Sequence, residues 1–218
     1  MYKDRKDAGQ KLSLLLQEYI GENVIVYGLT RGGVPVALEI ANFLDAPLEA
    51  FIVKKLGAPY QEELALGAIT EGKEPTIYYN REILAQLQLH VNDLKATVKK
   101  RKEQIEELQH LLRPNRDILI DRNATAIIVD DGIATGATMR AAIEFFRKGG
   151  QKKIVVAVPA GQKSVLDGLR NLVDDVVCPD IVTYMEAVGE FYRDFRQVEN
   201  DVVLDILKKS RKPIKNLK

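Results

Sequence analysis

Short apolar runs alternate with longer amphipathic stretches along most of the 218-residue chain. The runs are rich in Val, Ile and Leu and are not interrupted at every second position, which is typical of strands buried on both faces of a parallel sheet. They predict strands at 23–29, 47–53, 124–129 and 154–158. The amphipathic stretches predict helices at 2–20, 34–44, 139–148 and 164–172. Strands that alternate with helices in this way predict an α/β fold with a doubly wound parallel sheet.

The middle of the chain interrupts this alternation. Residues 65–70 and 76–79 predict two further strands. Residues 81–113 predict helix, with a break near 89–92 that divides the stretch into an inserted helical hairpin. From Val91 onward the apolar residues recur with a seven-residue period, which is typical of helices packed along a seam. The basic run at 99–102 is interpreted as its solvated face. We therefore predict a single domain over 1–207 and a basic C-terminal tail at 208–218.

Composition narrows the class of protein. Hydrophobic residues make up 46% of the chain, which is enough for one sizeable core. Lys and Arg number 32 against 31 Asp and Glu, so the overall basic field of a nucleic-acid binder is absent. A single cysteine, Cys178, excludes an internal disulfide, and the two histidines lack zinc-ligand spacing. The charged N-terminal residues and the lack of a long apolar run predict a cytoplasmic protein with no membrane segment.

Two adjacent carboxylates, Asp130 and Asp131, follow the apolar run 124–129. They lie where a buried parallel strand ends, and open α/β sheets bind ligands along that edge. The next residues, 132–138, are small or carry hydroxyls, so they can hold a phosphate at the N-terminus of the following helix. This arrangement fits a sugar phosphate, whose hydroxyls or bound metal the acids would contact. The other pair, at 174–175, precedes its strand and lacks such a loop, so we interpret it as a solvated strand entry.

Basic residues follow two other predicted strands. Arg31 with Gly32 and Gly33 comes after 23–29, and Lys54 with Lys55 comes after 47–53. The glycines do not fit the dinucleotide pattern G-x-G-x-x-G. An ordinary turn and a solvated lysine pair would explain each feature alone. Together with the aspartates, however, they form a complementary set for an anion, a sugar and a metal. The glycines would let the backbone approach a pyrophosphate closely, and the Arg31 guanidinium would donate two hydrogen bonds to it.

Residues 127–138 resemble the phosphoribosyl pyrophosphate (PRPP) motif of type I phosphoribosyltransferases. The loop at 31–33 resembles the pyrophosphate loop of that family, and the lysine pair resembles the basic pair before its mobile catalytic loop, which would span 57–72. Segments at 4–9, 67–69 and 187–195 are similar to an uncharacterised subgroup of predicted phosphoribosyltransferases. The resemblance implies the type I phosphoribosyltransferase fold, a hood over the acceptor at 184–195 and a homodimer.

The resemblance also assigns roles to individual residues. The catalytic residues would be Arg31, Lys54, Lys55, Asp130 and Asp131, and the two aspartates would hold Mg²⁺. Substrate binding would fall to Arg31, Gly32, Gly33, Ala134, Thr135, Gly136, Ala137 and Thr138.

The function that follows is a magnesium-dependent phosphoribosyltransferase, a pentosyltransferase that moves the phosphoribosyl group of PRPP to an unidentified acceptor such as a nucleobase and releases pyrophosphate. Ala134 stands where family members specific for 6-oxopurines carry an aspartate, so hypoxanthine and guanine are expected to be poor acceptors. One alternative is a regulator of the same fold that senses PRPP and binds nucleic acid, which the balanced charge disfavours. Another is a scaffold without chemistry, which the intact acids, basic pair and glycines disfavour.

Overall fold

A five-stranded parallel sheet forms the centre of the computed structural model, which describes residues 1–58 and 61–210, the side chains of 61–63 excepted. In spatial order its strands are β2 (Leu48–Phe51), β1 (Val24–Leu29), β6 (Thr125–Val129), β7 (Lys153–Ala157) and β9 (Asp175–Val177). Every neighbouring pair is parallel. The predicted doubly wound parallel sheet is therefore confirmed.

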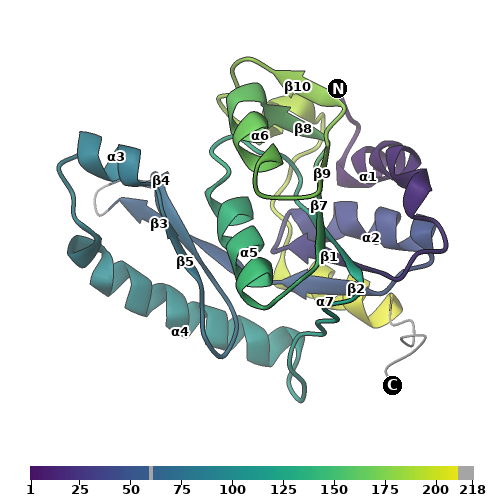
Figure 1. The fold of residues 1–218 in the computed structure, drawn as a ribbon, viewed down its shortest axis with the longest axis horizontal. Coiled ribbons are helices and arrows are strands. Elements are labelled where there is room, and N and C mark those ends of the chain that lie inside the picture. The colour runs from purple at the N-terminus through teal and green to yellow at the C-terminus, as the bar shows by residue number, and fades with distance from the viewer. Residues whose placement is uncertain (59–60, 211–218) are drawn as a thin grey trace.

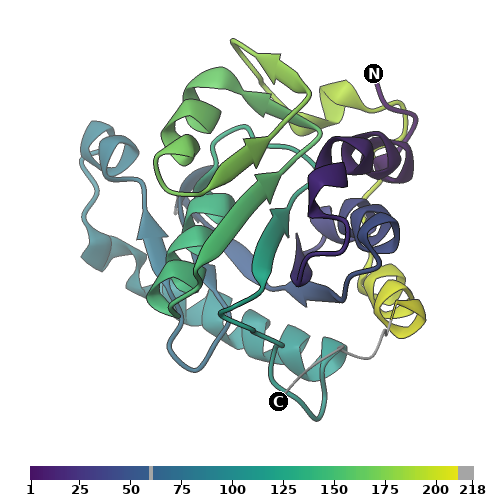
Figure 2. The same cartoon turned by 45° about the vertical axis from the view of Figure 1, so that its right-hand side comes forward.

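Helices cover both faces of this sheet (Figures 1 and 2). One face carries α1 (Arg5–Ser13), the 3-10 helix η1 (Leu14–Tyr19), α2 (Gly33–Leu44) and α7 (Asn200–Lys209), and the other carries α5 (Ala137–Lys148) and α6 (Lys163–Arg170). Alternate residues of a strand enter different cores: Ile127 and Val129 pack with α2, whereas Ala126 and Ile128 pack with α5. Burial on both faces explains why these strands read as continuous apolar runs.

A second unit is inserted between β2 and β6 and lies to one side of the sheet (Figure 1). It contains an antiparallel sheet of β3 (Val53–Ala58), β4 (Gln61–Thr70) and β5 (Ile77–Tyr79), and then α3 (Arg81–Gln86), the 3-10 helix η2 (Val91–Leu94) and α4 (Lys95–Leu112). The run predicted as one strand at 47–53 is thus two strands in different sheets, because β2 ends at Phe51 and β3 begins at Val53.

The stretch 81–113, predicted as an inserted helical hairpin, is largely helical. The buried residues of α4 are Ile105, Leu108 and Leu112, and they join a core that also contains Leu56 of β3 and Ile69 of β4. Most of the apolar seam of α4 therefore faces the antiparallel sheet, and contact with the 6-residue α3 is made through a smaller cluster that holds Val98 and Leu84.

A buried ion pair fixes the inserted unit to the main sheet. Glu71, directly after β4, pairs with Arg113, directly after α4, and both side chains are at most 2% exposed. Glu71 accepts a hydrogen bond from the Ile52 amide at 2.7 Å, and Arg113 donates to the Ala50 carbonyl at 2.6 Å. Both ends of the insertion are thereby held against the C-terminal part of β2.

The N-terminal residues meet the segment around 191–194 beside a small parallel sheet of β8 (Ala160–Gln162) and β10 (Asp180–Val182). Tyr2 forms an isolated bridge with Tyr192, which follows the 3-10 helix η3 (Val188–Phe191), and donates its hydroxyl to Pro159 O at 3.1 Å. Of the predicted tail, Lys208 and Lys209 belong to the last turn of α7, and 211–218 lie outside the described residues.

Candidate active site

The strand order reverses between β1 and β6, and this marks the expected ligand crevice. From β1 the chain passes through α2 to β2 on one side, whereas from β6 it passes through α5 to β7 on the other. Ligands of doubly wound sheets bind at such a switch point, outside the carboxyl ends of the strands. Gly28 and Val129 are register partners near those ends, so the loops that begin at Thr30 and Asp130 face the same crevice.

The loop after β1 presses closely against the loop after β6. The Thr30–Arg31 peptide bond is cis. A Cβ atom at Gly32 would collide with the Asp131 carboxylate, and one at Gly33 would lie 2.8 Å from Asp130 Cα. Only glycine fits at both positions, so Gly32 and Gly33 let Arg31 lie next to the two acids. The Thr30 hydroxyl in the same loop is buried and has no hydrogen-bond partner among the described residues.

Asp130 and Asp131 differ in their surroundings although both are half-buried. The Asp130 Oδ1 accepts a hydrogen bond from the Asp131 amide at 2.9 Å. Burial raises the pKa of Asp130 well above its usual range, the neighbouring Asp131 carboxylate adds to the rise, and Lys55 partly opposes it. Asp130 is therefore a carboxyl group poised to gain a positively charged or hydrogen-bond-donating partner.

Asp131 already has partners, and they come from segments far from it in sequence, near residue 5 and near residue 192. Its Oδ2 pairs with Arg5 Nε at 2.8 Å, and its backbone carbonyl accepts the Tyr192 hydroxyl at 2.6 Å. The Arg5 guanidinium carbon lies 3.9 Å from the centroid of the Phe195 ring, within cation–π range, and its NH1 donates to Arg196 O at 2.8 Å. The side chains of Arg5 and Asp131 are 12% and 14% exposed, so this ion pair is well shielded.

Positive charge gathers opposite the acids. Lys54 and Lys55 were predicted to follow the strand 47–53. They lie instead inside β3, where successive side chains point to opposite faces. Burial, Arg31 and then Arg101 lower the pKa of Lys54. Arg101 of α4 also donates to Lys55 O at 3.1 Å. Within the described residues no carboxylate pairs with Lys54, so an anion bound there would stabilise its charge.

The loop predicted to hold phosphate leads directly into α5. Its Ile133 is held by β8, since the Ile133 amide donates to Ala160 O and its carbonyl accepts from the Gln162 amide. Gly136 precedes α5 with φ of 71°, a left-handed conformation that favours glycine. The helix begins at Ala137, two residues earlier than predicted, so Ala137 and Thr138 supply amide groups of the first turn. Thr135 is exposed, and Ala134 and Thr138 are half-buried.

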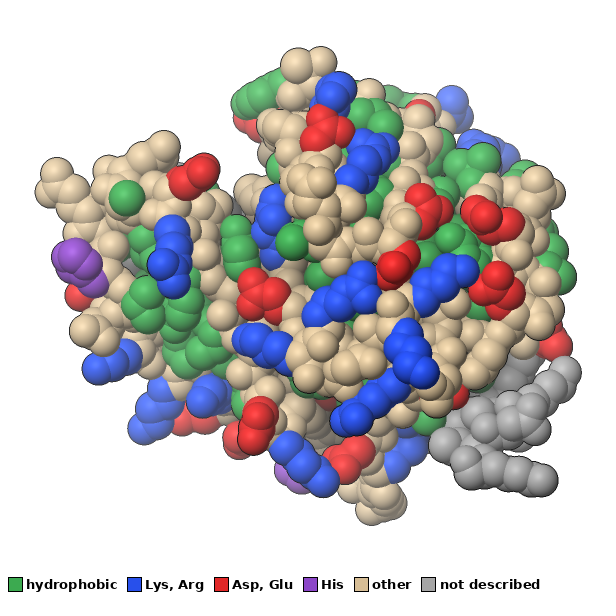
Figure 3. Space-filling model, in the orientation of Figure 1, with side chains coloured by type: hydrophobic (Ala, Val, Ile, Leu, Met, Phe, Trp, Pro, Cys, Tyr) green, Lys and Arg blue, Asp and Glu red, His purple; other side chains and the backbone are tan. Residues whose placement is uncertain are grey.

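The surface bordering the site is hollowed between the inserted unit and the body of the molecule (Figure 3). On the face shown there, Lys and Arg side chains are interspersed with Asp and Glu rather than gathered into one field. This face therefore carries no extended basic field.

A family profile for the phosphoribosyl transferase domain matches residues 2–196. The chain belongs to this family. Two relatives from the CDC 1551/Oshkosh and H37Rv strains of Mycobacterium tuberculosis, provisionally named phosphoribosyl transferases, are 38% identical over 212 residues, which are 97% of this chain and 47% of each relative. The chain thus spans about half the length of these relatives. The crystal structure of TT1426 from Thermus thermophilus shares 32% identity with a TM-score of 0.78 and covers 97% of this chain and 99% of that one.

Family membership confirms the resemblance drawn from residues 127–138, and with it the phosphoribosyltransferase fold. Within the described residues, no group of three or more His, Cys, Asp or Glu side chains is placed to hold a metal ion. None of the helices in the described part of the chain is long and apolar enough to cross a membrane.

Sequence reasoning gave no site contact to several residues, although Arg5 and Tyr192 fall in the segments 4–9 and 187–195 that resemble the family subgroup. Arg5 and Tyr192 lie far from the motifs in sequence, and Glu199 at the start of α7 pairs with Arg31 at 3.5 Å. Arg101 belongs to the stretch 99–102, which the sequence predicts as a solvated face. The second aspartate pair is structural, as predicted, but not merely solvated, because Asp174 pairs with Arg147 at 2.7 Å. The contact of Arg101 with β3 could not be predicted, because a basic residue on the polar side of an amphipathic helix has the same sequence pattern whether it faces solvent or another element.

Proposed function

We propose that the chain is a magnesium-dependent phosphoribosyltransferase that releases pyrophosphate from PRPP as the phosphoribosyl group passes to an acceptor. The observation that carries the proposal is the meeting of two acids, a cationic cluster and a helix N-terminus at one switch point. PRPP has hydroxyls, a pyrophosphate and a 5-phosphate in matching order. The family and the names of the Mycobacterium tuberculosis relatives support the same reaction class.

Asp130 and Asp131 would face the ribose. Departure of pyrophosphate leaves positive charge on the sugar ring, and a carboxylate fixed beside the ring stabilises that charge without reorganising. Asp131 is held by Arg5 and Tyr192, so it fits the role of a fixed orienting group. Asp130 has no cationic partner within hydrogen-bond distance among the described residues, so its carboxylate remains available to the ribose hydroxyls.

Arg31, Lys54 and Lys55 would bind the departing pyrophosphate. The pyrophosphate gains negative charge as the bond to the ribose breaks, so cations placed there stabilise the transition state more than the ground state. The low pKa of Lys54 reflects burial near Arg31 and Arg101, and an anion would relieve that repulsion. Arg101, which acts on the pKa of Lys54 and donates to Lys55 O, lies in the same group of cations.

The 5-phosphate would bind at 134–138. Backbone amides at the start of α5 point out of the helix, and the helix dipole favours an anion there. The hydroxyls of Thr135 and Thr138 add donors. The tight conformation of Gly136 brings the backbone to this position, and a Cβ there would lie 2.6 Å from a Val165 methyl.

The donor set fits magnesium only when substrate shares the coordination. Mg²⁺ is usually held by one or two carboxylates together with substrate oxygens, and Asp130 and Asp131 supply two carboxylates while the described residues offer no cage of three. Magnesium bound with PRPP would neutralise pyrophosphate charge. The protein's own part is to orient the ribose and to place cations on the leaving group.

The acceptor is proposed to be a base other than a 6-oxopurine. The Ala134 side chain cannot accept a hydrogen bond or exchange a proton with a purine ring nitrogen. Glu186 of the predicted hood is the candidate acid that could replace the missing aspartate, and it is exposed. We expect no pyrophosphate release with hypoxanthine or guanine, and Ala134→Asp alone should not create it. Turnover of either base at ordinary enzymatic rates, roughly 1 to 10³ per second, would contradict this assignment. Homodimerisation and cytoplasmic location stay predictions.

The test of the proposal is binding of PRPP with and without Mg²⁺, followed by thermal unfolding. A ligand at 100 times its Kd stabilises the folded state by about 2.7 kcal/mol. We expect PRPP with Mg²⁺ to raise Tm by several degrees, and inorganic phosphate to raise it much less. A shift with phosphate alone that equals the shift with PRPP would reduce the site to a general anion pocket. Salt-sensitive retention on nucleic acid would instead favour the regulatory alternative.

A further inference from the structure

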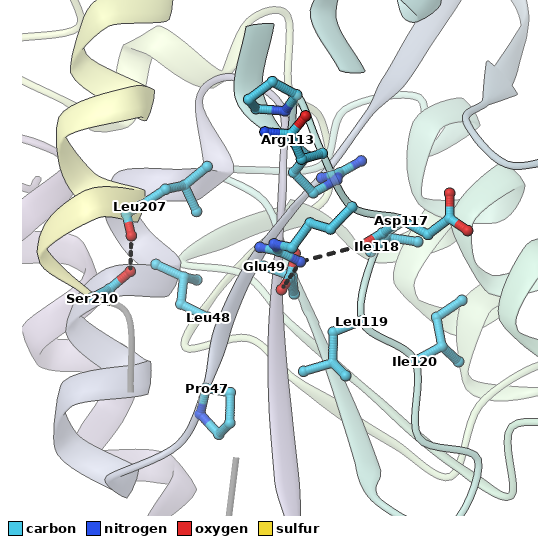
Figure 4. Close-up of a pocket in the computed structure, with 13 residues that line it drawn as sticks. Pro47, Leu48, Glu49, Arg113, Asp117, Ile118, Leu119, Ile120, Leu207 and Ser210 are labelled. Carbon is cyan, nitrogen blue, oxygen red and sulfur yellow. Dashed lines mark hydrogen bonds and ion pairs between the residues drawn. The ribbon is translucent and has the colours of Figure 1, made fainter. Parts of the chain in front are cut away.

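Ionic groups lie at both edges of the central sheet, and those near the strand starts balance one another. A cavity of about 880 Å³ lies at that edge, and its walls include Pro47, Glu49 and Leu119 (Figure 4). Arg116 pairs with Glu49 at 2.8 Å, and the other arginine of the cavity pairs with a buried glutamate. These paired charges give the cavity no preference for a charged ligand. The charges at the opposite edge, around Asp131, are arranged differently.

The N-terminal helix places a cation against the proposed crevice. Arg5 begins α1, and its Nε pairs with Asp131 Oδ2 at 2.8 Å. Within the part of the chain that the structure describes, this is the only ion pair of Asp131. Tyr192 contacts the same residue but donates to its backbone carbonyl, so it does not offset the negative charge. The carboxylate of Asp131 therefore depends on Arg5 for its counter-ion.

Asp131 also lies directly against the loop that is proposed to bind pyrophosphate. A Cβ atom added at Gly32 would overlap Asp131 Oδ2, the same oxygen that accepts from Arg5. A carboxylate at this distance repels an anion in the loop, and water screens the repulsion poorly because the Asp131 side chain is only 14% exposed. The loop can hold a pyrophosphate well only when this charge is offset.

The two other carboxylates that border the loop have cations of their own. Lys55 acts through its charge on Asp130, and Arg31 pairs with Glu199 at 3.5 Å. The Glu199 side chain is 63% exposed, so solvent screens its charge further. The shielded carboxylate of Asp131 is thus the one whose compensation comes from outside the crevice motifs.

Three contacts fix the Arg5 guanidinium in place. Its Nε holds Asp131, its NH1 donates to Arg196 O at 2.8 Å, and its central carbon lies 3.9 Å from the centroid of the Phe195 ring. The Arg5 side chain is 12% exposed. A cation that is held in this way offsets the carboxylate without reorganising when a ligand arrives.

We propose that Arg5 is a positioning residue for pyrophosphate binding: it holds and neutralises Asp131, and the loop 31–33 can then receive an anion. This inference rests on the proposed function, in which that loop binds the departing pyrophosphate. Arg5 acts through Asp131 and does not contact the substrate itself. Loss of Arg5 therefore weakens anion binding only while Asp131 keeps its charge.

The test is calorimetric titration of the full chain with pyrophosphate in EDTA, so that no metal takes part. Arg5→Met should weaken binding at least about tenfold. Arg5→Lys keeps the positive charge and should recover most of that loss. Arg5→Met combined with Asp131→Asn should recover it as well, because no uncompensated carboxylate then faces the loop. Asp131→Asn alone should bind pyrophosphate more tightly than the natural protein, and this arm does not depend on the folding of Arg5→Met.

Lys11→Met is the matched control, because it removes another cation of α1 that pairs with an exposed aspartate. Its affinity for pyrophosphate should stay within about twofold of the natural value. Unchanged affinity in Arg5→Met, or weaker binding by Asp131→Asn, would overturn the proposal. A double variant that binds as weakly as Arg5→Met would overturn it too, since Arg5 would then serve only to dock the N-terminal helix.

The same titration separates this inference from the proposed function. The natural protein should bind pyrophosphate in EDTA, and a lack of binding there would overturn the role of Arg5. Stabilisation of the natural protein by PRPP with Mg²⁺ tests the proposed function on its own. If that stabilisation is present and Arg5→Met binds pyrophosphate normally, the proposed function stands and the positioning role of Arg5 fails.

Discussion

At Asp130 the surroundings oppose the charge that the proposed chemistry requires. Burial and the Asp131 carboxylate raise the pKa of Asp130 above its value in the unfolded chain. A raised carboxyl pKa favours the folded state at low pH, and this contribution is lost as the pH rises through the folded pKa. The ionised form that the proposed catalysis requires therefore costs stability at neutral pH, as expected for a group kept for function.

Asp130→Asn should consequently raise Tm at neutral pH while it lowers turnover by about 10² to 10³-fold. Because Asn does not titrate, the gain in Tm over the natural protein should shrink as the pH falls towards the ordinary Asp pKa of about 3.9. Thermal unfolding at several pH values, together with pyrophosphate release, measures both effects.

Asp174→Asn is the matched control with the opposite sign. Partial burial raises the pKa of Asp174, but the Ile154 amide and Arg147 outweigh it and lower the pKa overall. Its stabilising contribution is present above the unfolded pKa and is lost as the pH falls through the folded pKa. This substitution should lower Tm at neutral pH and leave turnover unchanged. A loss of Tm in both variants would mean that Asp130 is structural.

Gly33→Ala should disrupt the site through a single methyl group. The added Cβ would meet the backbone of Val129 and Asp130, which cannot move as a side-chain end can. We expect loss of PRPP binding and a destabilisation of about 1 to 3 kcal/mol from overpacking. Gly149→Ala is the control, because its Cβ would lie 3.4 Å from the nearest atoms and its φ is −69°. Equal PRPP affinity in both variants would show that the close approach has no role in binding.

At the scale of elements, the sequence predicted those features that depend on residues close together in the chain. The strands and helices of the central sheet, the loop before α5 and the glycines at 32–33 all carry a signal in hydrophobic period or residue type. The inserted unit was harder, because a seven-residue period shows that one side of α4 is buried but not what covers it. The turn from β2 into β3 at Ile52 has no turn residue, so the sequence gives no reason to place Lys54 and Lys55 in a new strand.

The mobile loop predicted at 57–72 lies largely in β3 and β4, with 59–60 outside the described residues.

Arg113→Met should show how strongly the inserted unit depends on its buried anchor. Glu71 would be left charged and 0% exposed, and breaking such a pair on one side costs about 3 to 5 kcal/mol. Chemical denaturation should show this loss, and Glu71→Leu in the same chain should restore much of it because no unpaired charge remains. Lys73→Met, which breaks an exposed pair with Asp117, should change stability by no more than about 0.5 kcal/mol. Equal effects of Arg113→Met and Lys73→Met would contradict the anchoring role.

At the scale of the whole molecule, Arg5 and Asp131 link the N-terminal helix to the active site. The variants Arg5→Met and Asp131→Asn, made singly and together, should reveal a coupling of about 0.5 to 3 kcal/mol in a double-mutant cycle. The exposed pair of Lys11 and Asp7 should give only about 0.3 to 0.5 kcal/mol in the same experiment. A coupling near zero for the first pair would mean that Arg5 and Asp131 are neighbours without mutual stabilisation.

These long-range partners also mark the limit of prediction from the sequence. The motif at 130–138 identifies the acids and the phosphate loop, but nothing near Arg5 or Tyr192 in the sequence shows that both contact Asp131. Such contacts depend on where folding places segments that are far apart in the sequence. That placement is set by the packing of α1, η3 and the central sheet together. The sequence therefore identifies Asp131 as a candidate site residue but does not show that Arg5 and Tyr192 hold it in place.

The contact of the N-terminal residues with 191–196 has a kinetic consequence during synthesis. Arg5 donates to the carbonyl of a residue 191 positions later, and at about 5 to 20 residues per second a ribosome needs roughly 10 to 40 s to make that stretch. During this interval β1, α2, β2 and the inserted unit have already been synthesised, whereas Arg5 and Tyr2 still lack their partners at 191–196. The proposed crevice around Asp131 is therefore completed late, because Tyr192, which donates to Asp131 O, is made after all five strands of the central sheet.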